Sequence, residues 1–230
     1  VPAFCLARRT EARPPAGPDG PSGVGKGTVA REVAGRLGLR HVDTGAMYRA
    51  LAWRARQLAV DLDDEDAVLS VARTAVLDVQ GGTISVDGMD VTAAIRTPEI
   101  DRSVTRVARL PRVRAELVRR QRALAAAGGV VMEGRDIGTV VFPGAAVKIY
   151  LDASPEERAR RRAHDPAHAS SQTQALAEIA QAMERRDDAD RTRSTSPLVI
   201  APDAVVIDTT SMPVSEVVDR VLLVAGAAGR

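Results

Sequence analysis

Aromatic side chains make up only 2% of this 230-residue chain. The core must therefore be built from Val, Leu, Ile and Ala, and the stacking platforms of single-strand nucleic-acid binders are missing. The one cysteine, Cys5, excludes a framework of internal disulfides and is typical of a reducing compartment. No apolar run approaches the length of a membrane span, and no apolar segment precedes an export cleavage site. We therefore expect a cytoplasmic protein without a membrane partner.

The charge pattern does not favour a nucleic-acid partner. The formal net charge is +2, and 27% of the residues are charged against 45% that are hydrophobic. Arginines gather at 119–122, 158–162 and 185–193, where they can bind phosphates or form solvated helix faces. Acidic residues interrupt these clusters, which argues against a groove for a polyanion. We expect one enzyme core and, because no long exposed apolar stripe is evident, a monomer.

A glycine-rich segment near the N-terminus is predicted to hold a row of phosphates. Without Cβ atoms in the way, its backbone N–H groups can surround phosphoryl oxygens. Its lysine adds a point charge, and the helix that begins there adds its positive end. The expected ATP-binding residues are Gly20, Pro21, Ser22, Gly23, Val24, Gly25, Lys26, Gly27 and Thr28. The alternative is a glycine turn that only caps a helix.

This segment departs from the strict P-loop pattern at one position. A P-loop has Ser or Thr directly after the lysine, whereas here Gly27 stands there and Thr28 follows. The spelling GKGT resembles that of the nucleoside-monophosphate kinases. Thr28 is only a candidate ligand for the Mg²⁺ that accompanies ATP, so the sequence leaves the metal ligand unknown.

Strand and helix patterns alternate along most of the chain. Apolar runs at 39–43, 130–132, 147–151 and 204–207 are typical of buried strands, and each precedes a helix pattern. This alternation predicts an α/β fold with a doubly wound parallel sheet flanked by helices. Together with the resemblance of the GKGT segment to nucleoside-monophosphate kinases, it implies a P-loop kinase fold.

One stretch has a different pattern. Residues 76–91 alternate apolar and polar side chains around Gly-Gly and Asp-Gly pairs, which predicts a small antiparallel meander. We expect residues 19–230 to form the kinase domain, with an inserted subdomain at about 62–110 and an arginine-rich lid at about 158–193.

A P-loop follows a buried strand, but the residues before the glycine-rich segment lack the apolar pattern of such a strand. The charged residues and prolines within 6–19 cannot form a central parallel strand. Such a strand contributes roughly 6–12 kcal/mol from about four buried side chains, comparable with a domain's net stability of about 5–15 kcal/mol. Residues 1–7 supply the strand, or the sheet lacks it, or the residues before about 19 come from a misread start or a shifted reading frame. We treat residues 1–18 as an atypical N-terminal segment.

Three further segments carry candidate phosphate ligands. Thr44 and Arg49 lie in DTGAMYR, after a predicted strand, where ligands collect in open α/β sheets. Arg135 and Asp136 lie in EGRDIGTVVFP, where an arginine fork can bind phosphate and a carboxylate can accept from an exocyclic amine. The arginines of 186–193 form a candidate lid. The alternatives are a helix cap with a surface arginine, a surface ion pair, and a solvated helix end.

In this order and spacing, the motifs resemble those of the bacterial cytidylate kinases, which phosphorylate CMP and dCMP with ATP. The resemblance covers residues 19 to about 222, includes the IRT…LPRVR segment of 95–114 and VKIYLDAS, and depends most on DTGAMYR and EGRDIGTVVFP. It implies that the insertion at about 62–110 binds the monophosphate. The family usually has a hydrophobic strand where this chain has residues 13–18, and Thr105 stands where serine is familiar in some members.

The resemblance also implies a role for each site residue. Those expected around the CMP phosphate are Thr44, Arg49, Arg135 and Arg193. Those expected to read the cytosine are Thr105, Arg114 and Asp136. Those expected near the ribose are Arg186 and Asp190, and those on the lid side are Arg158, Arg161 and Arg162. The expected catalytic residues, which would spread the charge of the transferred phosphoryl group, are Lys26, Arg135 and Arg193.

Three other functions stay open at this point. The chain could be another small-molecule P-loop kinase, such as an adenylate or shikimate kinase, although the meander and EGRDIGTVVFP count against it. It could be a nucleotide-dependent regulator that binds nucleic acid, which tight and salt-sensitive binding would reveal. It could also be a homologue that its N-terminal departure has made catalytically impaired.

Overall fold

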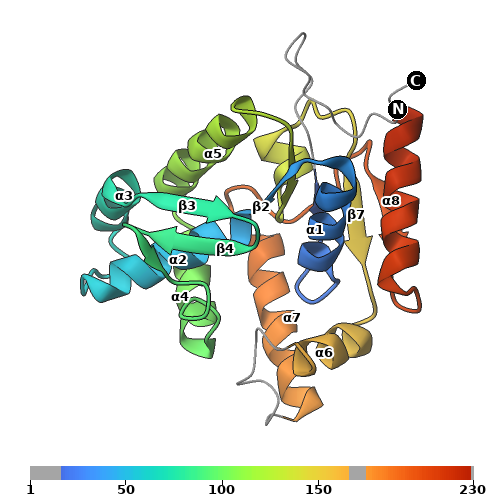
Figure 1. Ribbon diagram of the computed structural model, residues 1–230. Coiled ribbons are helices and arrows are strands. Elements are labelled where there is room, and N and C mark those ends of the chain that lie inside the picture. The colour runs from blue at the N-terminus through green and yellow to red at the C-terminus, as the bar shows by residue number, and fades with distance from the viewer. Residues whose placement is uncertain (1–16, 166–174, 229–230) are drawn as a thin grey trace.

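The structure is a computed structural model that describes residues 17–165 and 175–228. Within these residues, five parallel strands lie in the order β2–β6–β1–β7–β8 (Figure 1), in two hydrogen-bonded groups joined by a parallel bridge between Asp19 and Gly134. The strands are β1 (Pro18–Asp19), β2 (Arg40–Asp43), β6 (Val130–Glu133), β7 (Ile149–Asp152) and β8 (Val205–Asp208). This order confirms the predicted parallel sheet and places β1 at its centre.

Strand β1 is only two residues long. The charged residues and prolines within 6–19 predict that this segment forms no central strand. Pro18 and Asp19 pair with the first two residues of β7, so the prediction that no part of 6–19 forms a central strand is wrong for these two. Residues 1–7, the other candidate for this strand, lie outside the described residues, as does most of the segment 1–18.

Close packing and local hydrogen bonds explain how β1 fits into the sheet. A Cβ on Gly17 would lie 1.7 Å from the carbonyl oxygen of Met132, so only glycine fits there. The buried Asp19 carboxylate accepts hydrogen bonds from the backbone N–H groups of Ile137 at 2.9 Å and Gly138 at 2.7 Å. The central carboxylate is therefore satisfied by the loop after β6.

Helices cover both faces of the parallel sheet. They are α1 (Lys26–Leu37) and α8 (Val214–Ala228) on one face, and α2 (Thr44–Gln57) and α5 (Pro111–Ala126) on the other. The side chains of β6 alternate between the two cores: Val131 packs with residues of α1 and α8, and Val130 and Met132 pack with residues of α2 and α5. Burial on both faces explains why these strands read as continuous apolar runs.

Between α2 and α5, the chain forms a unit on one side of the sheet (Figure 1). It consists of α3 (Glu65–Thr74), β3 (Leu77–Gln80), β4 (Thr83–Val86), β5 (Met89–Asp90) and α4 (Pro98–Ala108). The three strands are antiparallel in the order β3–β4–β5, which confirms the predicted meander. Asp87 and Gly88 have φ values of 52° and 82°, the left-handed values that a tight hairpin turn requires.

Helices α6 (Pro155–Ala163) and α7 (Leu176–Thr192) pack against each other and lie below the sheet in Figure 1. They contain most of the predicted lid, while its residues 166–174 lie outside the described residues. Ser154 begins α6 by accepting a hydrogen bond on its hydroxyl from the N–H of Glu157 at 3.2 Å. Of the helices described in 17–165 and 175–228, none has both the length and the apolar character needed to cross a membrane.

Candidate functional site

The glycine-rich loop connects β1 to α1. Gly25 has a φ of 91°, which side chains rarely permit, and it directly precedes the helix. Lys26 begins α1, is buried, and donates from Nζ to the carbonyl oxygen of Pro21 at 2.5 Å. Burial, followed by the charge of Arg135, lowers the pKa of Lys26 well below its usual value. An anionic phosphate beside Nζ would favour the charged lysine.

Helices α6 and α7 hold this loop from the side. Asp187 of α7 is fully buried; it accepts a hydrogen bond from the N–H of Ser22 at 2.9 Å and forms an ion pair with Arg158 of α6. Arg158 donates to the Ser22 carbonyl at 3.1 Å, and Arg162 donates to the Ser22 hydroxyl at 2.8 Å. All three polar groups of Ser22 therefore have partners on the lid helices.

Two side chains of the EGRD segment follow β6 and enter the same region. Arg135 donates from Nε to Oδ2 of Asp190 on α7 at 3.0 Å. Asp136 is buried and accepts a hydrogen bond from Arg114 of α5. The Arg114 guanidinium lies over the Tyr48 ring, 5.1 Å from its centre. Arg114 and Asp136 thus form a buried ion pair, and the guanidinium of this pair also makes a cation–π contact with Tyr48.

Glu133 lies beside the first turn of α1. Its carboxylate is hydrogen-bonded to Nε2 of His41 at 2.9 Å, and its backbone carbonyl accepts from the Thr44 hydroxyl at 2.7 Å. A Cβ added to Gly27 would lie 3.1 Å from Oε1 of Glu133. The glycine after Lys26, which departs from the strict P-loop pattern, therefore leaves room for a carboxylate beside the loop.

Arginines of α2 and α7, and one that directly follows α7, lie nearby. Arg49 of α2 and Arg186 of α7 each donate to Oδ1 of Asp101 at 2.8 Å. Arg193, just after α7, donates from Nη1 to Oδ1 of Asp190 at 3.3 Å, on the other carboxylate oxygen from Arg135.

Four arginines of this region retain unused donors. In the part of the chain that the structure describes, the buried arginine nitrogens without a hydrogen-bond partner are Nε of Arg49, Nε of Arg114, Nε of Arg158 and Nη2 of Arg193. Unpaired buried donors cost free energy, and an incoming anion would pair with those it reaches.

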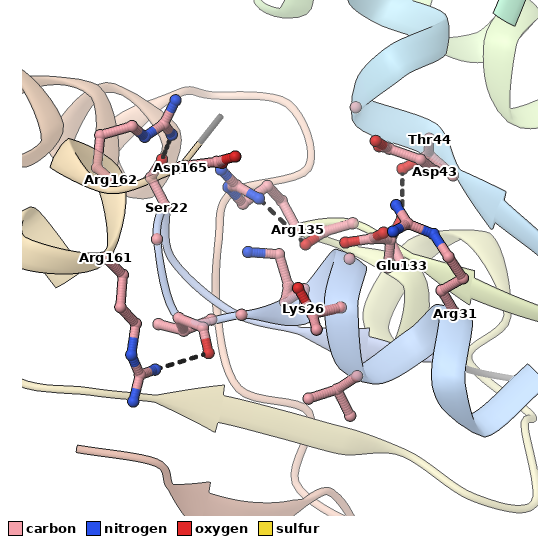
Figure 2. Close-up of a pocket in the computed structure, with 18 of the residues that line it drawn as sticks. Ser22, Lys26, Arg31, Asp43, Thr44, Glu133, Arg135, Arg161, Arg162 and Asp165 are labelled. Carbon is pink, nitrogen blue, oxygen red and sulfur yellow. Dashed lines mark hydrogen bonds between the residues drawn. The ribbon is translucent and has the colours of Figure 1, made fainter. Parts of the chain in front are cut away.

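Most of these groups line one cleft of about 790 Å³. In Figure 2, Lys26 and Glu133 extend into it between Arg161 and Arg162 on one side and Thr44 on the other. The predicted site residues that line it are Ser22, Gly23, Val24, Gly25, Lys26, Gly27, Thr28, Thr44, Arg49, Arg114, Arg135, Asp136, Arg186, Asp190 and Arg193. Arg161 and Arg162, predicted on the lid side, line it as well, whereas Gly20, Pro21, Thr105 and Arg158 do not. The Thr105 hydroxyl donates to the Asp101 carbonyl at 3.3 Å.

The sequence did not predict several residues of the cleft. Arg31 is on α1 three positions after Thr28, so helical spacing offered a weak signal. Asp43 and Glu133 end their strands directly before predicted site residues, and strand ends were available as a signal for both. Asp101, which does not itself line the cleft but pairs with two arginines that do, had no local signal, because its partner Arg186 lies 85 positions away.

The chain is similar to known proteins along most of its length. The family model for cytidylate kinase matches residues 17–226. A cytidylate kinase of Desulfitobacterium hafniense (strain Y51) is 47% identical over 207 residues, which cover 89% of each chain. Another, of Geobacillus kaustophilus (strain HTA426), is 50% identical over 208 residues, covering 89% of this chain and 92% of that one. A solved gluconokinase from Sinorhizobium meliloti 1021 has a similar fold, with a TM-score of 0.50, 14% identity and 94% of each chain covered. The chain belongs to the cytidylate kinase family.

Proposed function

We propose that this protein transfers the γ-phosphoryl group of ATP to CMP or dCMP, giving ADP and CDP or dCDP. The observation that carries the proposal is that the P-loop, an arginine cluster and the buried Arg114–Asp136 pair line a single cleft. A P-loop alone suits many kinases, whereas the buried pair adds a means of selecting the acceptor base. Relatives named cytidylate kinase, about half identical over most of their length, support the same acceptor.

The ATP end of the cleft would be the loop of residues 20–28. Its N–H groups and Lys26 would contact the β- and γ-phosphates, and the phosphates would restore the charge that burial disfavours on Lys26. Arg161 and Arg162 of α6 line the cleft beside the loop, where they would cover the phosphates from the lid side.

The acceptor phosphate would lie among Thr44, Arg49, Arg135 and Arg193. Arg49 and Arg193 each have one buried nitrogen without a partner in the described residues, which a phosphate oxygen would pair. Arg186 and Asp190, both on α7, would lie beside the ribose, so the lid helix would contact the acceptor as well as the loop.

The base would be recognised by the Arg114–Asp136 pair. Cytosine presents an amino group that can donate to the Asp136 carboxylate, and its ring nitrogen and carbonyl can accept from Arg114. Uracil places a carbonyl oxygen where cytosine has the amino group, so that oxygen would face a carboxylate in a buried site. Thr105 would join them only after a change in α4, because in this structure it does not line the cleft.

The reaction implies Mg²⁺ bound with ATP, and the residues present fit it. Nucleotide-bound Mg²⁺ is held by one or two protein carboxylates and by phosphate and water oxygens. Glu133 offers a carboxylate beside the first turn of α1, and Thr28 offers a hydroxyl that lines the cleft. These two residues would hold the ion, and when bound it would neutralise phosphate charge.

Phosphoryl transfer depends on position and charge more than on a strong base. The acceptor's phosphate is largely ionised at neutral pH, because its second pKa is about 6. One of its oxygens would form the new bond to the γ-phosphorus as the bond to the ADP oxygen breaks. Lys26, Arg135 and Arg193 would stabilise the transferred group, and closure of α6 and α7 would exclude water and so suppress ATP hydrolysis.

The test is ADP formation from ATP and Mg²⁺ in parallel reactions with CMP, dCMP, UMP, AMP and no acceptor. We expect CMP and dCMP to be used far faster than the rest, because an unmatched polar group in such a site costs about 10⁴-fold. Equal rates with UMP would contradict the role of Asp136. A folded protein without turnover on any acceptor would contradict the activity and favour an impaired homologue.

A further inference from the structure

Asp101 lies among three arginines where four helices approach one another. Its Oδ1 accepts from Arg49 of α2 and from Arg186 of α7, and its Oδ2 lies 3.9 Å from Nη1 of Arg162 on α6. Asp101 itself belongs to α4 of the inserted unit. One carboxylate therefore connects the insertion to the lid through side chains that line the cleft.

The face of α4 that carries Asp101 is the one that borders the cleft. Val104 and Ala108, three and seven positions further along the helix, both line it. The Asp101 side chain is 27% exposed. It is thus open enough for a second anion to compete for its partners.

The charges around Asp101 are only partly balanced. Burial alone would raise the pKa of Asp101, but the charges of Arg49 and Arg186 hold it well below its usual range, so the carboxylate stays ionised. Burial, followed by the charge of Arg49, lowers the pKa of Arg186 to about 9. The arginines therefore still repel one another with Asp101 in place, and the cluster has room for more negative charge.

Two of these arginines are the ones that the acceptor needs. Arg49 was assigned to its phosphate and Arg186 to its ribose, and both now donate to the same carboxylate oxygen. A phosphate oxygen offers the same geometry to an arginine and more charge. The acceptor must therefore either take these donors from Asp101 or bind beside a fixed negative charge.

We propose that Asp101 is a counterion that occupies, before the substrate binds, a donor of Arg49 that the acceptor's phosphate needs, and that it thereby sets the affinity for the acceptor. It assembles the arginines before the substrate arrives and opposes the phosphate once it binds, which also favours release of the phosphorylated product. This inference rests on the proposed function, because it takes a nucleoside monophosphate as the ligand.

The test is calorimetric binding of CMP and of cytidine to the wild type, Asp101→Asn and Glu99→Gln. Asp101→Asn keeps the shape of the side chain and removes its charge. Glu99→Gln removes a charge from the same helix at an exposed ion pair with Arg56, so it is the matched control. We expect CMP to bind Asp101→Asn about tenfold more tightly, which corresponds to ~1.4 kcal/mol. Cytidine, which lacks the phosphate, should bind all three proteins alike.

Each other outcome overturns the proposal. Unchanged or weaker CMP binding by Asp101→Asn would make Asp101 a supporting residue of the arginines, and equal tightening for cytidine would remove the phosphate from the explanation. Asp101→Ser provides the same comparison if the first variant does not fold. Unfolding of both variants, even with saturating CMP, would leave Asp101 as a structural counterion only. A wild type that binds no CMP would instead refute the proposed function.

Discussion

Replacing Arg135 with alanine should abolish turnover while leaving the fold intact. Arg135 is partly buried beside Lys26 and Asp190, and an arginine that stabilises a transferring phosphoryl group is worth about 10³–10⁵ in rate. We expect kcat to fall at least ~10³-fold, which corresponds to ~4 kcal/mol of transition-state stabilisation. The pKa of Lys26 should rise when the neighbouring positive charge is removed, so a neutral lysine would not explain the loss.

The cost in stability should be smaller than the cost in rate. Without Arg135, the Asp190 carboxylate still accepts from Arg193 at 3.3 Å, and we expect the free energy of unfolding to fall by about 1–3 kcal/mol. The assay is coupled ADP formation with CMP, beside a denaturant unfolding curve. Arg119→Ala is the control, because that arginine is exposed and pairs with Glu116 on the surface. A folded Arg135→Ala protein with kcat within tenfold of the wild type would refute the reasoning.

Three further predictions concern the base, the central carboxylate and the core. Asp136→Asn should narrow the preference for CMP over UMP by about 10²-fold or more, as measured by kcat/KM with both acceptors, and an unchanged ratio would remove Asp136 from base selection. Burial raises the pKa of Asp19 to about 7, although hydrogen bonds from two N–H groups lower it, so the folded protein keeps a proton that the unfolded chain releases near pH 4. Stability relative to Asp19→Asn should therefore fall as pH rises from 4 to 7 and level off above; a difference that does not change with pH in denaturant titrations would contradict this. Leu151→Ala removes a fully buried side chain of β7 and should lower the free energy of unfolding by about 2–5 kcal/mol; a loss under 1 kcal/mol would mean that the core closes over the cavity.

Local patterns predicted the elements that local physics determines. The meander of 77–90 followed from alternation and an Asp-Gly turn, and the strand of 130–133 followed from its apolar run, because both faces of the sheet are buried. Most predicted site residues line the cleft for a similar reason: loops at the carboxyl ends of neighbouring parallel strands meet at one edge.

Tertiary contacts decided the rest. Strand β1 could not be predicted from its composition, because Gly17 fits only against the backbone of Met132 and Asp19 is satisfied by N–H groups more than a hundred positions away. The same holds for Asp187, whose partner Ser22 lies 165 positions earlier. A charge run such as 186–193 does not reveal which of its members are buried, and here Asp187 and Asp190 are.

Helix α7 has one further consequence. Asp187 contacts the P-loop through Ser22, and on the same helix Arg186 and Asp190 line the part of the cleft proposed to bind the acceptor. A rigid movement of this helix displaces all three side chains at once. If the binding of one nucleotide moves α7 into the position that the other requires, the second nucleotide binds more tightly. Thermodynamic linkage makes this change in affinity equal for the two nucleotides. Under the proposed function, the two substrates would therefore be coupled through the lid helix.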